Sequence, residues 1–363
     1  MTWDLWRWVR DPIGLLRERA ATAPVFGLTL WRRAVVGYRP EWNRAILGDT
    51  ATFRAAGSLS GLTPYLAGGV VHSDPPEHDA RRRELNPHFH NRGIATLVKR
   101  LDEVAADHAP QGPFEALEWA GTVVRRMLNA AFFQGQVSDD LLRRYFEPLH
   151  RPLPQPLLPR PVLFGRMENA IAAVLQDPPA DTLAWSLAPV SGAVEEIRVA
   201  LAAGYDTTAH TLAWAAWHLA AAPAWRREEG LPAVIDETLR LYPAGWIGSR
   251  VCARDVVVAG TPVRAGSLVL YSPFLTHHDP DLWPDADVFR PDRFAEGRPA
   301  WGFLPFSAGR RTCLGAHLDR AMLRAALMSC VEGALERRGG DPTPRASLTL
   351  RPAGPLLLTR TAR

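Results

Sequence analysis

The chain has 363 residues, of which 47% are hydrophobic and 22% are charged, and its formal net charge is +4. This length and apolar content allow a sizeable core, in one domain or two, and exclude a chain that is disordered as a whole. Nearly all basic residues are arginines, with Lys99 the only lysine, and they are scattered rather than interleaved with aromatic residues. The composition therefore predicts no nucleic-acid binding.

Cysteine usage and the first residues of the chain indicate a reducing environment. Cys252, Cys313 and Cys330 form no C-x-x-C pair, which argues against a disulfide framework or a zinc site. The first residues, M-T-W-D-L-W-R-W-V-R-D-P, contain no long apolar run, so neither a signal peptide nor a transmembrane anchor is predicted. We therefore expect a cytoplasmic protein.

The first part of the chain combines short helices with one strand pair. Trp3, Trp6 and Trp8 are predicted to cover an edge of the protein itself, because their segment is too short for a stable helix on a membrane surface. Residues 53–71 are rich in Gly, Ser and Thr, which predicts a long loop of the kind that often contributes to binding. Helices are predicted over 10–23 and 39–47, and a β-hairpin over 25–30 and 33–37.

The next predicted helix carries two basic side chains on one face. It follows Pro75 and Pro76, in positions where a helix start tolerates proline. His78 and Arg82 are four residues apart and therefore share a face, where two donors can hold an anionic group. A solvated basic face is the alternative for an isolated pair.

A long helix is predicted in the middle of the chain. Ser191 is a suitable N-cap, Glu195 and Glu196 fall in the first turn, and Pro223 ends the helix near residue 222. Before it, residues 151–161 contain five prolines, a density that no helix survives. Other helical patterns cover 93–108, 114–133, 138–149 and 162–175.

Small side chains line one face of this long helix. Ala203, Gly204 and Thr207 lie on one side with Ala200 and Thr211. Such a stripe lets a flat, wide ligand approach the helix, and close packing against another helix is the alternative. A glycine in a helix interior is about 1 kcal/mol less favourable than alanine, which is consistent with a functional reason for Gly204.

The last third of the chain contains short elements. A helix is predicted over 231–241, in which Glu237 and Arg240 are spaced to form an ion pair. Strands are predicted over 246–260 and 263–273, and a terminal hairpin over 346–359 around the turn at 352–355.

One cysteine lies in a glycine-containing loop, F-S-A-G-R-R-T-C-L-G, directly before a helical pattern. A thiolate is favoured at a helix N-terminus and beside cations, and Cys313 precedes such a helix and follows Arg310 and Arg311. A lone cysteine is more often a small buried hydrophobe. The complete spacing F-x-x-G-x-R-x-C-x-G favours the other interpretation, a thiolate ligand of haem iron.

The neighbours of the cysteine in this loop fit a flat ligand. Gly309 and Gly315 allow unusual backbone angles or the close approach of such a ligand. Phe306 can pack against the sulfur or against the ligand face.

The loop resembles the haem-binding loop of the cytochromes P450, and three other segments resemble that family in the same order. They are H-x-x-x-R at 78–82, A-A-G-Y-D-T-T at 202–208, and E-T-L-R at 237–240 followed by F-R-P-D-R-F at 289–294. The resemblance extends from about residue 72 to the C-terminus. It implies that residues 1–363 form a single cytochrome P450 domain, mainly α with small β-sheets, with haem between the long central helix and the cysteine loop and its helix.

The resemblance also implies a cofactor and a reaction. The cofactor is heme b (iron protoporphyrin IX), with Cys313 as the ligand of the iron. Asp206 and Thr207 match the family's acid–alcohol pair, which manages protons for oxygen activation and is replaced in the peroxygenases. The intact pair favours an oxidoreductase of the monooxygenase class, a hydroxylase that uses dioxygen. The implied cofactor-binding residues are Cys313, His78, Arg82, Ala203, Gly204, Arg250, Phe306, Gly309, Arg311 and Gly315.

Two structural roles are implied in the same way. His78, Arg82, Arg250 and Arg311 are expected to bind the haem propionates. Glu237, Arg240 and Arg293 are expected to form a buried network that fixes the cysteine loop.

Electrons are expected to come from ferredoxin and ferredoxin reductase, because the chain has no flavin or nucleotide motif and no iron–sulfur cysteines. A basic patch around the cysteine is expected to steer this acidic partner. For Arg320 and Arg324 a solvated helix face is the equal alternative. We expect a monomer. The predicted patch comprises Arg310, His317, Arg320 and Arg324.

The expected substrate is small and apolar, because Ala203, Trp246 and Ile247 are expected to line the pocket. The stretch 239–250, L-R-L-Y-P-A-G-W-I-G-S-R, is similar to short bacterial P450s that hydroxylate carotenoids; a fatty acid or a terpenoid fits as well. The region that forms the family's lid is short here, a departure from the family pattern. Alternative functions are a haem–thiolate isomerase or dehydratase, a haem-binding sensor or carrier, and a helical protein without a cofactor.

Overall fold

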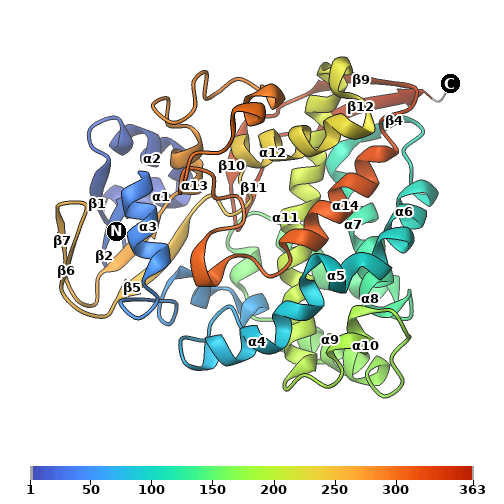
Figure 1. Cartoon of the computed structure of the whole chain (residues 1–363), viewed down its shortest axis with the longest axis horizontal. Coiled ribbons are helices and arrows are strands. Elements are labelled where there is room, and N and C mark those ends of the chain that lie inside the picture. The colour runs from blue at the N-terminus through green and yellow to red at the C-terminus, as the bar shows by residue number, and fades with distance from the viewer. Residues whose placement is uncertain (1–2, 362–363) are drawn as a thin grey trace.

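Residues 3–361 are described by the computed structural model shown in Figure 1. The fold is mainly helical with small sheets, as predicted. Most helices gather around the long central helix α11 (Ala193–Ala221), while the N-terminal strands and the largest sheet lie on the other side of the molecule (Figure 1). Within the described residues, no helix is long and apolar enough to cross a membrane.

The helical predictions agree with the structure along most of the chain. Helix α12 (Leu231–Leu241) has the predicted bounds, and the proline-rich segment contains only one short helical turn, Gln155–Leu157. The other helices are α1 (Trp3–Arg10), α2 (Pro12–Ala20), α3 (Pro40–Gly48), α4 (Glu77–Phe89), α5 (Asn91–Ile94), α6 (Val98–Asp107), α7 (Ala116–Phe133), α8 (Asp139–Phe146), α9 (Pro161–Val174), α10 (Leu183–Leu187), α13 (Pro273–His277) and α14 (Ala316–Met328).

The helix predicted over 10–23 occurs as α2, and a further helix, α1, precedes it. Asp11 separates them, and its carboxylate caps the second helix. Trp8 packs against Trp246 with ring centroids 5.7 Å apart, whereas Trp3 and Trp6 are exposed. The prediction that the three tryptophans cover the protein's own edge therefore holds for Trp8 alone.

The central helix α11 begins one residue later than predicted. Its N-cap is Gly192, with φ +72°, so the assignment of Ser191 as the cap was wrong. Glu196 does lie in the first turn, as predicted, and its buried carboxylate accepts hydrogen bonds from Arg81 at 2.8 Å and from the amide of Val70 at 3.1 Å. The start of α11 is therefore tied to α4 and to the loop 53–71.

The largest sheet joins distant parts of the sequence. The predicted hairpin of β1 and β2 is confirmed, and β2 also pairs in parallel with β8, in the order β1-β2-β8-β5-β3. Arg250 lies on β5, the neighbour of β3 in the loop region. The bounds are β1 (Val25–Thr29), β2 (Arg33–Gly37), β3 (Phe53–Arg54), β5 (Gly248–Cys252), β8 (Leu268–Tyr271), and, in a separate pair, β6 (Val256–Val258) and β7 (Thr261–Val263).

The predicted terminal hairpin was wrong, because its two strands belong to different sheets. Strand β11 (Leu350–Pro352) pairs with β10 (Pro344–Ala346), whereas β12 (Leu356–Thr361) pairs with β9 (Ala334–Gly340) and β4 (Gly112–Glu115). Local sequence could not reveal these partners, because β9 reads A-L-E-R-R-G-G and is exposed along most of its length. Pairing between strands far apart in the sequence therefore determined which sheet β11 and β12 each joined.

Candidate functional site

The cysteine loop is folded by its own backbone and by contact with α3. The amide of Cys313 donates to the carbonyl of Phe306 at 2.8 Å. Gly309 has φ +70°, and a Cβ there would lie 2.5 Å from the carbonyl oxygen of Leu47. Gly315 has φ −83°, and no other part of the chain that the structure describes lies within 4 Å of such a Cβ. Gly309 is therefore required by packing against α3, whereas the space beside Gly315 is open.

The cations expected beside the sulfur are not the ones that act on it. The Cys313 side chain is exposed, although surrounding protein groups desolvate its sulfur. Burial, together with the charge of Asp319, raises the pKa of Cys313 to about 11, against the opposing effect of Arg82. Arg310 and Arg311 instead pair with acids outside the loop, so the prediction that they favour the thiolate was wrong. A metal ion deprotonates a thiol that coordinates it, and such an ion would supply what the local charges do not.

Four predicted basic residues gather near this loop. Burial lowers the pKa of His78, and the nearby charges of Arg311 and Arg82 lower it further. Burial likewise lowers the pKa of Arg311, with a further contribution from the charge of Arg250. These effects place His78 and Arg82 of α4, Arg250 of β5 and Arg311 in one cationic cluster.

The cationic cluster (His78, Arg82, Arg250 and Arg311) is not fully satisfied by protein groups. Arg311 donates to the carbonyls of Val71 and Ser73, and it pairs with Asp74 at 2.8 Å. The Nε atoms of Arg82, Arg250 and Arg311 nevertheless are buried and have no hydrogen-bond partner within the described residues. Unpaired guanidinium donors in a group of like charges fit the carboxylates of a bound haem.

The small-residue face of α11 is open in its predicted centre. Ala203 is exposed and Gly204 and Thr207 are partly buried, whereas the adjacent Tyr205 and Asp206 are buried. Thr207 Oγ1 donates to the carbonyl of Ala203 at 2.8 Å. A Cβ on Gly204 would make only an ordinary contact with another side chain, at 3.6 Å. Tight packing against another helix therefore does not explain Gly204.

Helix α14, which follows the cysteine, lies beside α11 in the centre of Figure 1. Thr208 of α11 donates to Asp319 of α14 at 2.5 Å, which links the two helices directly. Phe306 is partly buried, and the guanidinium carbon of Arg320 lies over the Phe306 ring, 5.3 Å from the ring centroid. The structure therefore brings the cysteine loop and the central helix together, as predicted for the two sides of a haem site.

Asp206 and Thr207 are adjacent in sequence but face different surroundings. Asp206 is buried among His150, His210 and Thr349, which we call the Asp206 cluster. The hydroxyl of Thr349 donates to Asp206 Oδ2 at 2.6 Å, and His150 Nδ1 lies 2.8 Å from Oδ1. Burial alone would raise the pKa of Asp206, but His210, His150 and Thr349 together hold it below its usual value.

The sequence analysis missed the partners of Asp206. His210 lies four residues further along α11, a spacing that could have indicated it. His150 ends a short helical turn after α8, and Thr349 precedes β11, so no local signal marks either. The ligand atoms of His150, Asp206 and His210 lie within 4.8 Å of one another, a geometry that a metal ion could also use.

The predicted buried network is confirmed. Glu237 accepts two hydrogen bonds from Arg240, at 2.7 and 2.8 Å, and a third from Arg293 at 3.0 Å. His277 extends the network to the chain before the cysteine, because its Nε2 accepts from the amide of Leu304 at 2.7 Å while its Nδ1 lies 3.1 Å from the carbonyl of Arg240. We call Glu237, Arg240, His277 and Arg293 the cysteine-side network.

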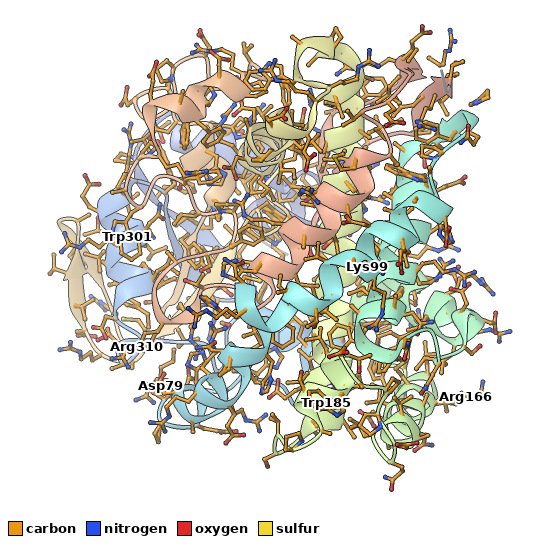
Figure 2. The ribbon with its side chains drawn as sticks, turned by 45° about the vertical axis from the view of Figure 1, so that its right-hand side comes forward. Asp79, Lys99, Arg166, Trp185, Trp301 and Arg310 are labelled. Carbon is orange, nitrogen blue, oxygen red and sulfur yellow. The ribbon has the colours of Figure 1, made fainter. Side chains whose placement is uncertain are left out.

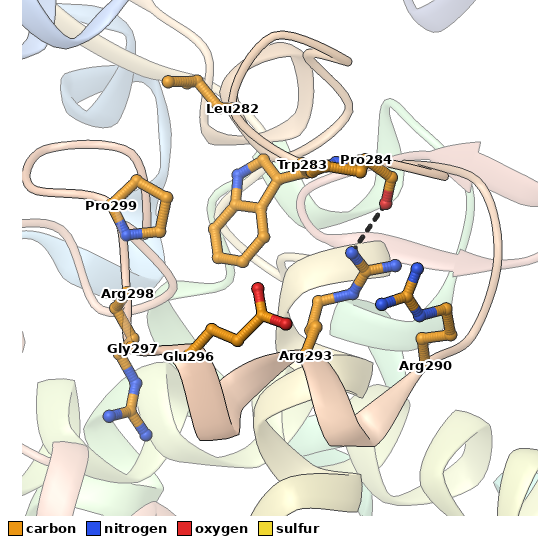
Figure 3. Close-up of a pocket in the computed structure, with 9 residues that line it drawn as sticks. All are labelled: Leu282, Trp283, Pro284, Arg290, Arg293, Glu296, Gly297, Arg298 and Pro299. Carbon is orange, nitrogen blue, oxygen red and sulfur yellow. Dashed lines mark hydrogen bonds between the residues drawn. The ribbon is translucent and has the colours of Figure 1, made fainter.

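A surface hollow of about 330 Å³ lies against this network but contains none of the predicted cofactor residues. Figure 3 shows Arg293 directed at the carbonyl of Pro284, a bond of 2.8 Å, with Glu296 below the Trp283 ring. The hollow is therefore part of the surface around the scaffold. It is lined by Leu282, Trp283, Pro284, Arg290, Arg293, Glu296, Gly297, Arg298 and Pro299.

Two expectations about the surroundings of the site need correction. Trp246 is buried, packs on Trp8 and donates to the carbonyl of Ser347, so it belongs to the core; Ile247 is partly buried.

Acids neutralise the arginines of the expected basic patch. Arg310 pairs with Asp79 (Figure 2), Arg320 with Asp236, and Arg324 with Glu228 and Asp102, while His317 contacts the ring of His90.

Comparisons with known proteins agree with this geometry. The family model described as cytochrome P450 matches residues 230–333. The chain is 28% identical to cyclooctat-9-en-7-ol 5-monooxygenase of Streptomyces melanosporofaciens, over 90% of this chain and 86% of that protein. The crystal structure of CYP175A1 from Thermus thermophilus is 26% identical, with a TM-score of 0.84 over 99% of this chain and 97% of that one. The retinoic acid-bound cyanobacterial CYP120A1 has a TM-score of 0.87 at 20% identity, over 100% of this chain and 98% of that one, which is a likeness of fold.

Proposed function

This chain belongs to the cytochrome P450 family and is a monooxygenase with a haem cofactor, and we propose that it hydroxylates a small apolar substrate with electrons from a separate ferredoxin. One observation carries the proposal. The accessible thiol of Cys313 lies directly before α14, a helix that Thr208 and Asp319 link to α11 next to its open Ala203–Thr207 face, and a cationic cluster with unpaired donors lies near the same loop.

The residues that would hold the haem are those of the cysteine loop and the cationic cluster. Bound haem supplies an iron that binds and activates dioxygen, and a thiolate ligand donates electron density to that iron. We assign Cys313 as this ligand. Because its pKa is raised to about 11, the thiol would lose its proton when it binds the iron rather than before. His78, Arg82, Arg250 and Arg311 would bind the propionates.

Proton handling is assigned to Asp206 and Thr207. The Thr207 hydroxyl, on the open face of α11, holds a proton at Oγ1 and donates it in a hydrogen bond to the carbonyl of Ala203. Asp206 stores or transfers a proton on the buried side of the same helix. This arrangement supports a dioxygen-dependent hydroxylase over an isomerase, a dehydratase or a haem-binding sensor.

An apolar substrate is supported by the residues near the open helix face and by the relatives. Ala203 offers no polar side chain, and Ile247 is partly buried near β5. One relative is named for cyclooctat-9-en-7-ol and one structural neighbour for bound retinoic acid, two largely hydrocarbon molecules. A terpenoid, a carotenoid or a fatty acid is the substrate class that we propose.

A ferredoxin and its reductase are proposed as the electron donors because the sequence contains no flavin, nucleotide or iron–sulfur motif. The neutralised arginines near the cysteine indicate that charge steering contributes little. We therefore expect the rate of reduction by ferredoxin to depend weakly on salt concentration. We further propose that the chain acts as a single-domain monomer in the cytoplasm.

The spectrum of the reduced, carbon monoxide-bound protein tests the assignment of the ligand. Thiolate ligation gives a red-shifted Soret band, which Cys313→Ser should remove and Cys330→Ala, in the buried core, should leave in place. A band that survives in Cys313→Ser would move the ligand to another residue. Screening terpenoids, carotenoids and fatty acids for a high-spin shift, followed by turnover with and without dioxygen and ferredoxin, then separates a hydroxylase from the other haem–thiolate functions.

A further inference from the structure

The Asp206 cluster joins three segments that lie far apart in the sequence. His150 ends the short helical turn Glu147–His150, directly before the proline-rich segment. Asp206 and His210 lie on α11, and Thr349 precedes β11. Among the three titratable side chains of the cluster His150 is the most accessible, at 22% against 3% for Asp206 and 1% for His210. His150 therefore connects a buried carboxylate with solvent.

Proton positions follow from the bonds of Thr349. Its hydroxyl has one proton, which it donates to Asp206 Oδ2 at 2.6 Å. His210 Nδ1, 2.9 Å from the same hydroxyl oxygen, must therefore be the donor in that contact. Burial lowers the pKa of His210 to about 4, which keeps this ring neutral. Thr349, supported by His210, thus holds Oδ2 of Asp206 in place, and neither side chain passes a proton to the carboxylate.

His150 contacts the other oxygen of Asp206. Its Nδ1 lies 2.8 Å from Oδ1, and these two buried atoms have no aligned hydrogen bond within the described residues. Its Nε2 lies 2.8 Å from the hydroxyl of Tyr205, whose pKa is raised by burial. Tyr205 therefore stays protonated, and a small rotation of the His150 ring would complete a bond to Asp206.

Helix α7 leaves room for this contact at a glycine. A Cβ on Gly121 would lie 3.0 Å from the Tyr205 hydroxyl and 3.3 Å from His150 Nε2. A glycine inside a helix is less favourable than alanine by about 1 kcal/mol, so Gly121 needs a reason. The space that it leaves is occupied by the His150–Tyr205 pair.

We propose that His150 is the proton entry of the Asp206 relay. A hydronium ion of the solvent protonates the neutral His150 ring and leaves as water, the imidazolium donates its Nδ1 proton to Asp206 Oδ1, and a neutral imidazole and a carboxylic acid remain. No electrons move in this step. The inference rests on the proposed function, because it supplies a donor for the acid assigned to proton handling.

The elements that pack against His150 contribute further charged or titratable groups near its ring. Arg351 of β11 donates to the His150 carbonyl at 3.3 Å, and the ring of His210 meets the His150 ring edge-on at 5.2 Å. On α7, Arg125 lies near Tyr205 and is itself paired with Asp139. The carboxylate in contact with the imidazole ring is that of Asp206.

Histidine ring NMR of the haem-loaded, reduced and carbon monoxide-bound protein tests this contact without turnover. The ring signals of His150 should shift in Asp206→Asn, because the variant removes the carboxylate oxygen that lies 2.8 Å from His150 Nδ1. The ring of His108, which follows α6 and is bonded to the carbonyl of Val104 in that helix, is the reference, and its signals should stay in place. Unchanged His150 signals would overturn the proposal.

Oxygen consumption driven by ferredoxin and its reductase tests the relay itself. His150→Gln should slow consumption by about ten-fold and remove its pH dependence and solvent isotope effect, while His108→Gln keeps all three. Gly121→Ala places a methyl group of α7 against the His150–Tyr205 pair and should give a smaller loss of oxygen consumption. This variant replaces His150→Gln as the test if His150→Gln does not fold.

The variants also separate this inference from the function on which it rests. If Asp206→Asn and Thr207→Ala change the pH dependence and His150→Gln does not, His150 is not the entry although the relay stands. If none of the three changes it, the assigned proton function fails. One zinc ion per purified chain, lost in both His150→Gln and His210→Gln, would identify the cluster as a metal site and overturn the relay.

Discussion

The cysteine-side network and the Asp206 cluster are both buried and both polar, but their hydrogen bonds are completed to different degrees. Glu237 accepts from Arg240, from Arg293 and from the amide of Arg290, and Arg240 also donates to backbone carbonyls. In the Asp206 cluster, His150 Nδ1, Asp206 Oδ1 and His210 Nε2 have no aligned partner within the described residues.

This difference indicates different tasks. A buried polar network with all bonds made holds one geometry, because any movement leaves a charge unpaired. A cluster with free donors and acceptors can change partners at little cost in energy, as proton transfer requires. The first network is suited to fix the loop that carries Cys313, and the second is suited to the proton transfer that we propose for it. Substitutions should therefore affect stability on the cysteine side and proton-dependent turnover on the α11 side.

The largest effect on stability is expected for Arg240→Met. Removing one partner of a buried ion pair leaves Glu237 uncompensated and typically costs about 3–5 kcal/mol. Urea unfolding should show this loss, and the purified variant should contain less haem. Arg143, paired with Asp140 on the surface, provides the control, and Arg143→Met should leave the unfolding midpoint unchanged. Equal stability of the two variants would contradict the scaffold role.

Two glycines of the cysteine loop, Gly309 and Gly315, allow a matched test of how this loop contributes to stability. Gly309→Ala forces a left-handed conformation on alanine, which costs about 1–2 kcal/mol, and also presses its Cβ against the carbonyl of Leu47. Gly315→Ala has an ordinary φ and open space, so its stability should stay close to that of the parent. Thermal unfolding of both variants decides this, and the reverse order would mean that the loop does not pack on α3 as described.

Low pH should lower the free energy of unfolding through protonation of His277 in the cysteine-side network. Burial holds the pKa of His277 well below its usual value, while the unfolded chain titrates near its ordinary value of about 6.5. The unfolded state therefore binds more protons as the pH falls below about 6.5, and the free energy of unfolding declines over that range. His277→Gln should flatten this decline in urea unfolding at stepped pH. A decline of unchanged slope would assign the effect to other groups.

The smallest effect on stability is expected on the α11 side, from Thr207→Ala. Among residues 3–361 the lost hydroxyl bonds only within its own helix, and alanine gains up to about 0.7 kcal/mol of helix propensity. Turnover should change nonetheless, because electrons would still be consumed while fewer of them lead to hydroxylated product. Product and hydrogen peroxide measured against electrons consumed test this. Unchanged coupling would remove Thr207 from the proton path.

Prediction from sequence succeeded where a contact depends on close neighbours along the chain. The assignment of Cys313 as a haem ligand stays a prediction, but the pair of Glu237 with Arg240 at helical spacing could be identified because its geometry is set within a few residues. The cations that act on Cys313 could not, because Arg310 and Arg311 turn toward acids outside the loop while Arg82 approaches from α4. Sequence proximity gave the wrong partner because side-chain direction depends on tertiary packing.

The sequence by itself determined the helix-rich architecture, the cysteine loop and the open stripe at Ala203–Thr207, since each depends on local periodicity or local spacing. Only the tertiary structure decided that Asp206 is held by His150 and Thr349, and that β12 pairs with β9 and β4. Those contacts join residues far apart in the chain, and their energy exists only after the intervening loops have closed.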